Sequence, residues 1–266
     1  MSDSSPAEFE EAACEAAAAA GRIVRRRFGE KEPVRVELKG LHDFVTETDR
    51  EAEAAVVDEL RRRYPGHAVM SEEGSPEEEA ADYRWVVDPL DGTTNFIHGV
   101  PVFAVSVALE DRRGLVAGAI YDPLRDEMFR AHRGGGARMN RSAIRCSDPA
   151  ATDQALIATG FPFRELSRVD RYLKAFEAFI RSTAGIRRAG SACLDLAYTA
   201  CGRYDGFWEI GLSRWDVAAG VLIVREAGGT VTDVIGGDRA LETGDIVAAG
   251  ARFHPLLLEV TRAAFA

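Results

Sequence analysis

Hydrophobic positions recur along the chain with the two periods that distinguish helices from strands. Residues 7–28 predict a helix with one apolar face, which Gly29 ends. The residues of this face are Phe9, Ala13, Ala16, Ala20 and Ile23. A capping box that begins at Thr48 predicts a second helix, which stops at Pro65. Asp49 is therefore expected at a helix N-terminus.

Short apolar runs between turn-forming residues predict strands. Before residue 145 these runs are 34–38, 68–70, 85–87, 102–109, 115–121 and 127–132, and the last three alternate like antiparallel strands. After residue 145, strands and helices alternate instead. The predicted strands there are 155–158, 185–188, 206–210, 230–234 and 246–249, and the predicted helices are 169–180, 192–200, one opening at Ser213, and 253–265. We therefore expect an α/β (α+β) chain of two lobes, residues 1–144 and 145–266.

Composition fits a soluble globular protein. The chain has 266 residues, of which 46% are hydrophobic and 29% charged. No run approaches the ~20 apolar residues of a membrane helix, and we expect a cytoplasmic protein. The formal net charge of -10 argues against a nucleic-acid or anionic-membrane partner. Four cysteines without zinc-site spacing are expected to be reduced thiols.

The most informative stretch runs from Trp85 to Asn95. An apolar strand leads into Asp88, Asp91 follows three residues later, and the intervening proline and the following glycine predict a sharp turn. The run Gly-Thr-Thr-Asn that starts at Gly92 suits the beginning of a helix, where free N–H groups can hold an anion. Two carboxylates beside an anion repel it unless cations lie between them. The stretch therefore predicts a divalent metal bound next to a phosphate.

Three further acids occupy comparable places. Glu72 follows the strand 68–70, Asp216 opens a helix, and Asp49 lies at a helix start. Any one of them alone would be interpreted as a solvated turn or helix-dipole residue. Together with Asp88 and Asp91 they favour a metal site, because α/β folds place their sites at strand ends and helix starts. Carboxylate oxygens are also the ligands that hard cations prefer.

Residues Trp85–Asn95, followed by Phe96–Pro101, closely resemble the first signature of the inositol monophosphatases. Residues 215–220, with 226–229, resemble the second signature, and 43–49 with 72–73 fit the remaining metal-site segments. The resemblance covers essentially the whole chain. It implies a layered αβαβα sandwich of the sugar-phosphatase type and usually a homodimer. It also implies magnesium-dependent, lithium-sensitive hydrolysis of a small phosphate monoester, with myo-inositol 1-phosphate as the first candidate.

The resemblance implies two to three Mg²⁺ ions held by this chain. One ion would bind Glu72, Asp88 and the backbone carbonyl of Leu90. A second would bind Asp88, Asp91 and Asp216. A third, weaker site would involve Glu72.

The resemblance also implies roles in catalysis and substrate binding. Asp49 and Thr93 would orient and activate the attacking water, and Glu72 counts with them among the catalytic residues. Backbone N–H groups of Gly92 and Thr93 would hold the phosphate. The remaining implied substrate contacts are Asp91, Ala192, Glu209 and Asp216.

Several alternatives stay open at this stage. Relatives that act on histidinol phosphate, fructose 1,6-bisphosphate or phosphoadenosine phosphate share the same metal core, although Thr94 favours the inositol branch. Ser213 stands where a histidine often lies in the family, which leaves open how the inositol ring is contacted. The role of Lys39 is open as well. A family member with a regulatory binding role is the alternative of a different class. Arg188 is interpreted as a surface arginine rather than a substrate contact.

Overall fold

The apolar run around Trp85 lies inside a seven-stranded sheet in the computed structural model of the chain. The structure describes residues 4–30, 36–40, 43–74, 81–163 and 165–266. The strands follow one another across this sheet in chain order. They are β3 (Ala68–Ser71), β4 (Tyr83–Asp91), β5 (Ala104–Asp111), β6 (Gly114–Asp122), β7 (Glu127–His132), β8 (Ala137–Met139) and β9 (Ser142–Ala143). β3 and β4 run parallel, and each later neighbour is antiparallel.

Two helices cover the outer face of this sheet, α1 (Pro6–Phe28) and α2 (Glu47–Arg63). α1 starts at a capping box between Ser5 and Glu8, and its alanine-rich face is buried against the strands. Small side chains let the helix approach the sheet closely, because they add little volume between the two backbones. A small antiparallel pair, β1 (Val36–Gly40) and β2 (Asp43–Thr46), lies before α2. The predicted strand 34–38 falls partly outside the described residues.

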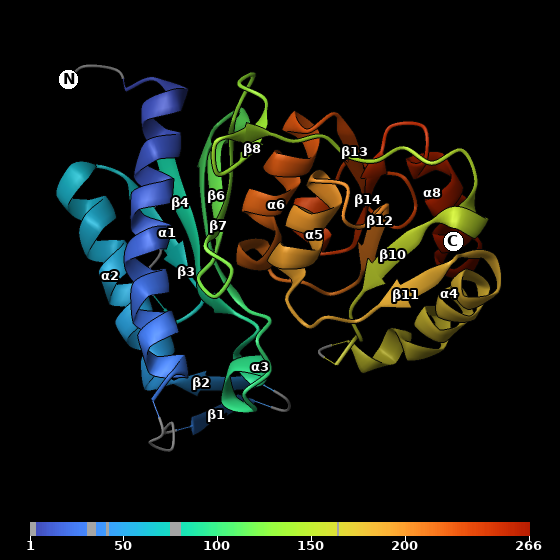
Figure 1. Cartoon of the computed structure of the whole chain (residues 1–266), viewed down its shortest axis with the longest axis horizontal. Coiled ribbons are helices and arrows are strands. Elements are labelled where there is room, and N and C mark those ends of the chain that lie inside the picture. The colour runs from blue at the N-terminus through green and yellow to red at the C-terminus, as the bar shows by residue number, and fades with distance from the viewer. Residues whose placement is uncertain (1–3, 31–35, 41–42, 75–80, 164) are drawn as a thin grey trace.

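The second sheet has five strands in the order β11-β10-β12-β14-β13. They are β10 (Leu156–Thr159), β11 (Gly185–Arg187), β12 (Gly206–Glu209), β13 (Gly229–Thr232) and β14 (Ile246–Gly250). β10 is parallel to β11 and β12, whereas β14 is antiparallel to β12 and β13. The helices α4 (Val169–Ser182) and α8 (His254–Phe265) pack together on the outer side of this sheet (Figure 1). Shorter elements are α3 (Thr93–Ile97), α7 (Ala240–Thr243) and the 3-10 turns η1 (Thr152–Gln154) and η2 (Leu166–Arg168).

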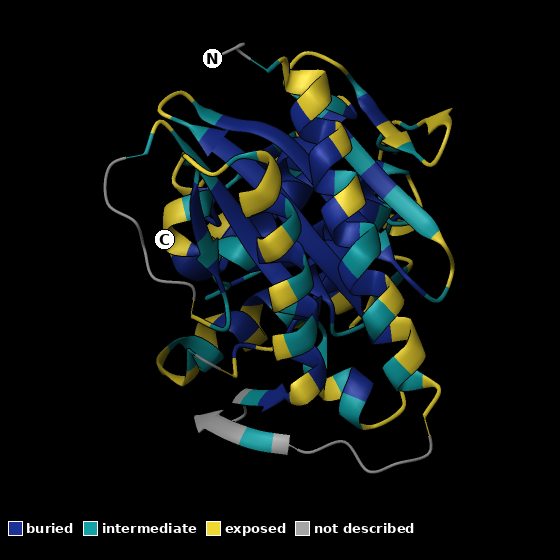
Figure 2. Ribbon diagram, turned by 90° about the vertical axis from the view of Figure 1, so that its left-hand side faces the viewer, coloured by how far each residue is buried: buried dark blue, intermediate teal, exposed yellow. Residues whose placement is uncertain are grey.

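Between the two sheets lie α5 (Ala192–Ala200) and α6 (Arg214–Glu226), which are buried on nearly all sides. Figure 1 shows the resulting order of layers, helices α1 and α2, sheet, α5 and α6, sheet, helices α4 and α8. Figure 2 shows buried positions concentrated in the strands and exposed positions on the outer turns of the helices. The predicted αβαβα architecture is therefore confirmed. The lobe boundary between residues 144 and 145 stays a prediction.

Two local predictions were wrong. The capping box of α2 begins at Thr46, not Thr48: the N–H of Thr48 donates to the Thr46 side chain, and the N–H of Thr46 donates to Asp49 at 2.9 Å. The sharp turn predicted from Pro89 and Gly92 does not begin at Pro89: β4 continues through it to Asp91 with a register shift after Asp88, and the chain turns at Gly92.

Two further predictions concern the cysteines and membrane spans. The four cysteines are free thiols, as predicted. In the part of the chain that the structure describes, no helix is both long and apolar enough to cross a membrane.

Candidate active site

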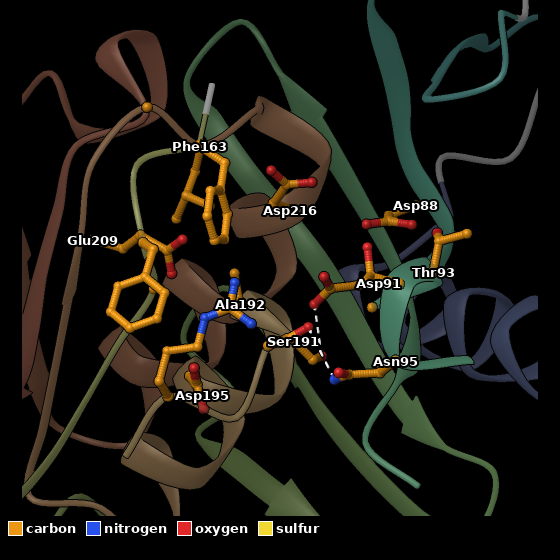
Figure 3. Close-up of a pocket in the computed structure, with 18 of the residues that line it drawn as sticks. Asp88, Asp91, Thr93, Asn95, Phe163, Ser191, Ala192, Asp195, Glu209 and Asp216 are labelled. Carbon is orange, nitrogen blue, oxygen red and sulfur yellow. Dashed lines mark hydrogen bonds between the residues drawn. The ribbon is translucent and has the colours of Figure 1, made fainter. Parts of the chain in front are cut away.

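A cavity of about 380 Å³ lies where the end of β4 meets the starts of α5 and α6. Every residue with a predicted role except Asp49 lines it, and Asp49 lies directly behind Thr93. Figure 3 shows Asp88, Asp91 and Thr93 on one side of the cavity and Glu209 and Asp195 on the other. The predicted residues that line it are Glu72, Asp88, Leu90, Asp91, Gly92, Thr93, Ala192, Glu209 and Asp216.

The backbone between Asp88 and Thr93 determines how this side of the cavity is built. Asp88 accepts a hydrogen bond from the N–H of Leu90 at 3.0 Å, which closes the irregular segment around Pro89. Gly92 then has φ +97°, and a Cβ at this position would lie 2.9 Å from the carbonyl oxygen of Val102. Only glycine fits there without strain. α3 therefore begins directly beside Asp91, and the first N–H groups of a helix have no partner within the helix.

Asp88 is the centre of a group of acids. Its side chain is fully buried, and this burial is the main reason why its pKa is well above the ordinary value. The negative charges of Glu72, Asp91 and Asp216 raise the pKa further. β3 and β4 are adjacent and parallel, which brings Glu72 beside Asp88 as predicted for two strand ends. Among the described residues that line the cavity, Arg188 is the one basic side chain, and it lies at the far wall. A divalent cation fits this donor set, because hard cations prefer carboxylate oxygens and a positive charge would oppose the repulsion among these acids.

The carboxylates are not arranged around a single point. Among the described residues, no group of three or more acidic, histidine or cysteine side chains stands ready to hold one metal ion. Instead they accept hydrogen bonds from their own surroundings. Asp91 accepts from the Ser191 hydroxyl and the Cys193 N–H, both at 2.7 Å, and Asp216 accepts from the Ser213 N–H at 2.8 Å. Both of the bonds to Asp91 end on the same carboxylate oxygen.

A hydroxyl and a buried carboxylate adjoin the acids. The Thr93 hydroxyl lies 3.0 Å from an Asp49 oxygen and 3.0 Å from the Leu90 carbonyl. The other Asp49 oxygen accepts from the N–H and the hydroxyl of Thr46. Burial raises the pKa of Asp49, and the hydrogen bonds from Thr46 and Thr93 oppose that shift. This network fixes the Thr93 oxygen at the cavity wall.

The structure also brings together residues that the sequence did not single out. The Asn95 amide donates to the carbonyls of Val102 at 2.8 Å and Ala189 at 2.9 Å, with the carbonyl of Gly190 at 3.3 Å. It thereby joins α3 to the segment before α5. Asn95 lies inside the first signature, but nothing in its neighbourhood in sequence indicates a partner so far along the chain. Ser191, which precedes the predicted Ala192, was missed for the same reason.

Glu209 lies at the end of β12, close to the loop that follows β10. A Cβ on Gly160 would lie 1.9 Å from a Glu209 carboxylate oxygen, so residue 160 must be small for this carboxylate to lie as it does. Asp195, in the first turns of α5, is also buried at the cavity. Burial raises its pKa well above the ordinary value, and Glu209 and Asp91 raise it further.

Comparison with known proteins identifies close relatives. The chain is 50% identical over 251 residues to Nus factor SuhB of Pseudomonas aeruginosa. This match covers 92% of the present chain and 93% of the Pseudomonas protein. It is 45% identical over 249 residues to an inositol-1-monophosphatase of Mesorhizobium japonicum, covering 93% and 94%.

Solved structures show the same architecture. The extragenic suppressor protein suhB from Bartonella henselae superposes with a TM-score of 0.92 at 43% identity, covering 96% of this chain and 98% of that one. An inositol monophosphatase from Anabaena has a TM-score of 0.85 at 38% identity, covering 96% and 95%. Residues 5–265 match the family model described as the inositol monophosphatase family. Because this match spans nearly the whole chain and includes every residue that lines the acidic cavity, the chain belongs to the inositol monophosphatase family.

Proposed function

We propose that the chain is a magnesium-dependent phosphatase that hydrolyses a small phosphate monoester, with myo-inositol 1-phosphate as the first candidate. The observation that carries the proposal is the buried Asp88, surrounded by Glu72, Asp91 and Asp216 and adjacent to the hydrogen-bonded Thr93–Asp49 pair. Family membership and the name of the Mesorhizobium relative support the same reaction class.

In this proposal Glu72, Asp88, Asp91, Asp216 and the Leu90 carbonyl hold two to three Mg²⁺ ions. When bound, the ions supply charge neutralisation of the phosphate oxygens and a lowered pKa of bound water. The roles of these ligands are carried over from the resemblance.

The chain's own groups then orient the reactants. Thr93 accepts a hydrogen bond from the attacking water and passes its own hydroxyl proton toward Asp49, whose carboxylate it already contacts. Free N–H groups of Gly92 and Thr93 at the start of α3 bind the phosphate. Ala192, at the start of α5, and Glu209, at the end of β12, contact the leaving group, as do Asp91 and Asp216. Attack by water in line with the leaving oxygen requires no covalent enzyme intermediate.

The Asp91→Asn variant tests this reaction. We expect it to abolish magnesium-dependent phosphate release from inositol 1-phosphate, because an amide does not bind Mg²⁺ as a carboxylate does. The fold should persist, since the Asn oxygen can still accept the bonds from Ser191 and Cys193. Phosphate release and the melting temperature are measured together, with Asp153→Asn in the exposed η1 turn as the control. Undiminished turnover by Asp91→Asn would overturn the assignment.

Substrate choice is tested separately, by a panel of inositol 1-phosphate, histidinol phosphate, fructose 1,6-bisphosphate and phosphoadenosine phosphate with magnesium. We expect inositol 1-phosphate to give the highest kcat/KM. Inhibition by lithium, a homodimer in solution and a cytoplasmic location also belong to the proposal, on the strength of the resemblance alone.

A second function is favoured by a specific observation. The Pseudomonas relative at 50% identity is named a Nus factor, as is a relative from Escherichia coli at 45%. We propose that this chain can also serve as a Nus factor. With a net charge of -10, its contacts in that role would be with protein rather than with nucleic acid. If no substrate of the panel is turned over, this second function becomes the principal one.

A further inference from the structure

The wall of the cavity opposite Asp88 is built from two aromatic rings and an arginine. The rings of Phe161 and Phe163 lie 5.8 Å apart, nearly perpendicular to each other. The guanidinium carbon of Arg188 lies 5.1 Å from the centre of the Phe161 ring and 5.4 Å from that of Phe163. These cation–π contacts hold the planar guanidinium in place without using its N–H donors. Figure 3 shows Phe163 and Glu209 on this side of the cavity.

Arg188 differs from other arginines of the chain in what it contacts. Arg168 forms a double hydrogen bond with Asp245, and Arg214 binds Glu110. Arg188 makes no hydrogen bond or ion pair with any residue in the described ranges, yet it lines the cavity. Its five N–H donors are therefore available to a ligand.

The charges around Arg188 indicate the kind of ligand group. Glu209 and Asp195 line the same end of the cavity, and the positive charge of Arg188 opposes the upward shift in the pKa of Asp195. A second phosphate at this end would meet the carboxylate of Glu209 and is disfavoured. A neutral hydroxyl can accept from Arg188 and donate to a carboxylate at once. The rings of Phe161 and Phe163 offer apolar surface to the C–H groups of a cyclic polyol.

We infer that Arg188 is a specificity-determining residue that donates hydrogen bonds to hydroxyl oxygens of the leaving group, at the end of the substrate farthest from the phosphate. The inference rests on the proposed phosphatase function and deepens it. It differs from the sequence interpretation, which favoured a surface arginine. Arg188 is exposed, as that interpretation expected, but it also lines the cavity.

The test compares Arg188→Gln with wild type on two substrates, inositol 1-phosphate and phenyl phosphate, whose leaving group has no further hydroxyls. We expect KM for inositol 1-phosphate to rise about tenfold, the effect of losing one hydrogen bond from a charged donor, with kcat little changed. Kinetics with phenyl phosphate should stay the same. Arg187→Gln is the matched control, because the neighbouring Arg187 is exposed, lies outside the cavity and donates to the Ile186 carbonyl.

A binding measurement separates this inference from the proposed function. Free inositol is titrated into wild type and both variants in the presence of magnesium, and heat release or the rise in melting temperature is recorded. Weaker binding by Arg188→Gln alone supports the inference even if wild type hydrolyses neither ester. Equal binding and equal KM values in all three proteins would overturn it, as would an equal loss on both esters.

Discussion

Thr93 and Asp49 come from different elements, α3 and the first turn of α2, yet their side chains share one hydrogen bond. The sequence placed each at a helix start, and the resemblance paired them. The structure adds the reason why the pair is well oriented. Thr46 caps α2 through its own side chain and holds the far oxygen of Asp49, so the near oxygen faces Thr93.

The Thr93→Val variant tests this pair at the scale of one residue. Valine has nearly the same shape but no hydroxyl, so the water loses its partner and the route for its proton. We expect kcat for inositol 1-phosphate to fall at least about 100-fold, the usual contribution of a positioned acid or base. Thr93→Ser, which keeps the hydroxyl, should retain most of the activity. Equal kcat values for the valine and serine variants would contradict the role of the hydroxyl.

At the scale of elements, the site depends on how α3 and α5 are held against each other. α3 follows the end of β4, the second strand of the seven-stranded sheet, and α5 belongs to the second half of the chain. Two sets of hydrogen bonds hold α3 and the end of β4 against the start of α5. Asp91 accepts from Ser191 and Cys193 at the start of α5, and Asn95 donates to the backbone just before it. Ala192 is therefore positioned by contacts that it does not make itself.

We expect Asn95→Asp to lower kcat/KM for inositol 1-phosphate at least about tenfold, because a carboxylate would face carbonyl oxygens in place of an N–H donor. Since Asn95 acts by positioning, the change should appear in both KM and kcat. The control is Asn140→Asp, in which an amide that donates to the Asp126 carbonyl in a surface turn is changed in the same way. Steady-state kinetics and the melting temperature of both variants are measured. Identical kinetics in the two variants would show that the hydrogen bonds of Asn95 have no part in positioning the site.

At the scale of the whole molecule, α6 lies between the two sheets and carries Asp216 to the acids of β4. Gly118 of β6 allows this close packing, since a Cβ there would lie 3.1 Å from the Cα of Ala219. The site therefore exists only when both halves of the chain are folded together. The stability of the outer layer bears on it indirectly, because α1 and α2 support the sheet from behind.

A pH-dependent contribution to stability is expected in that outer layer. His67 stacks between Tyr64 and Tyr83, with ring centres 4.8 and 4.9 Å away, and burial lowers its pKa below the 6.5 of an exposed histidine. As pH falls below about 6.5, the unfolded chain binds a proton at His67 that the folded chain does not, so folding becomes less favourable. Urea unfolding at about pH 7.5 and 5.5 should therefore show a larger loss of stability for wild type than for His67→Phe. The same loss in both proteins would rule out this contribution.

The sequence by itself determined the local structure and the family. Periodic apolar positions predicted all the long helices, and turn residues bounded most strands, because these features depend on neighbours a few positions away. The strands β8 and β9 were not predicted because they have only three and two residues, too few to show a period. Thr46 was not predicted as the cap of α2 because a capping box that begins at Thr48 matches the sequence pattern equally well. The spacing of Asp88 and Asp91 pointed to metal and phosphate before any fold was known.

Only the tertiary structure decided which distant residues share the cavity. Ser191 meets Asp91 and Asn95 meets Ala189 across about a hundred residues of chain, and no local pattern encodes those contacts. The same holds for Arg188, which reads as an ordinary surface residue in sequence. Its position depends on where the loop after β10 places Phe161 and Phe163. The acids that we propose bind the metal lie in recognisable local motifs, whereas the wall that we propose contacts the leaving group is assembled from segments far apart in the chain.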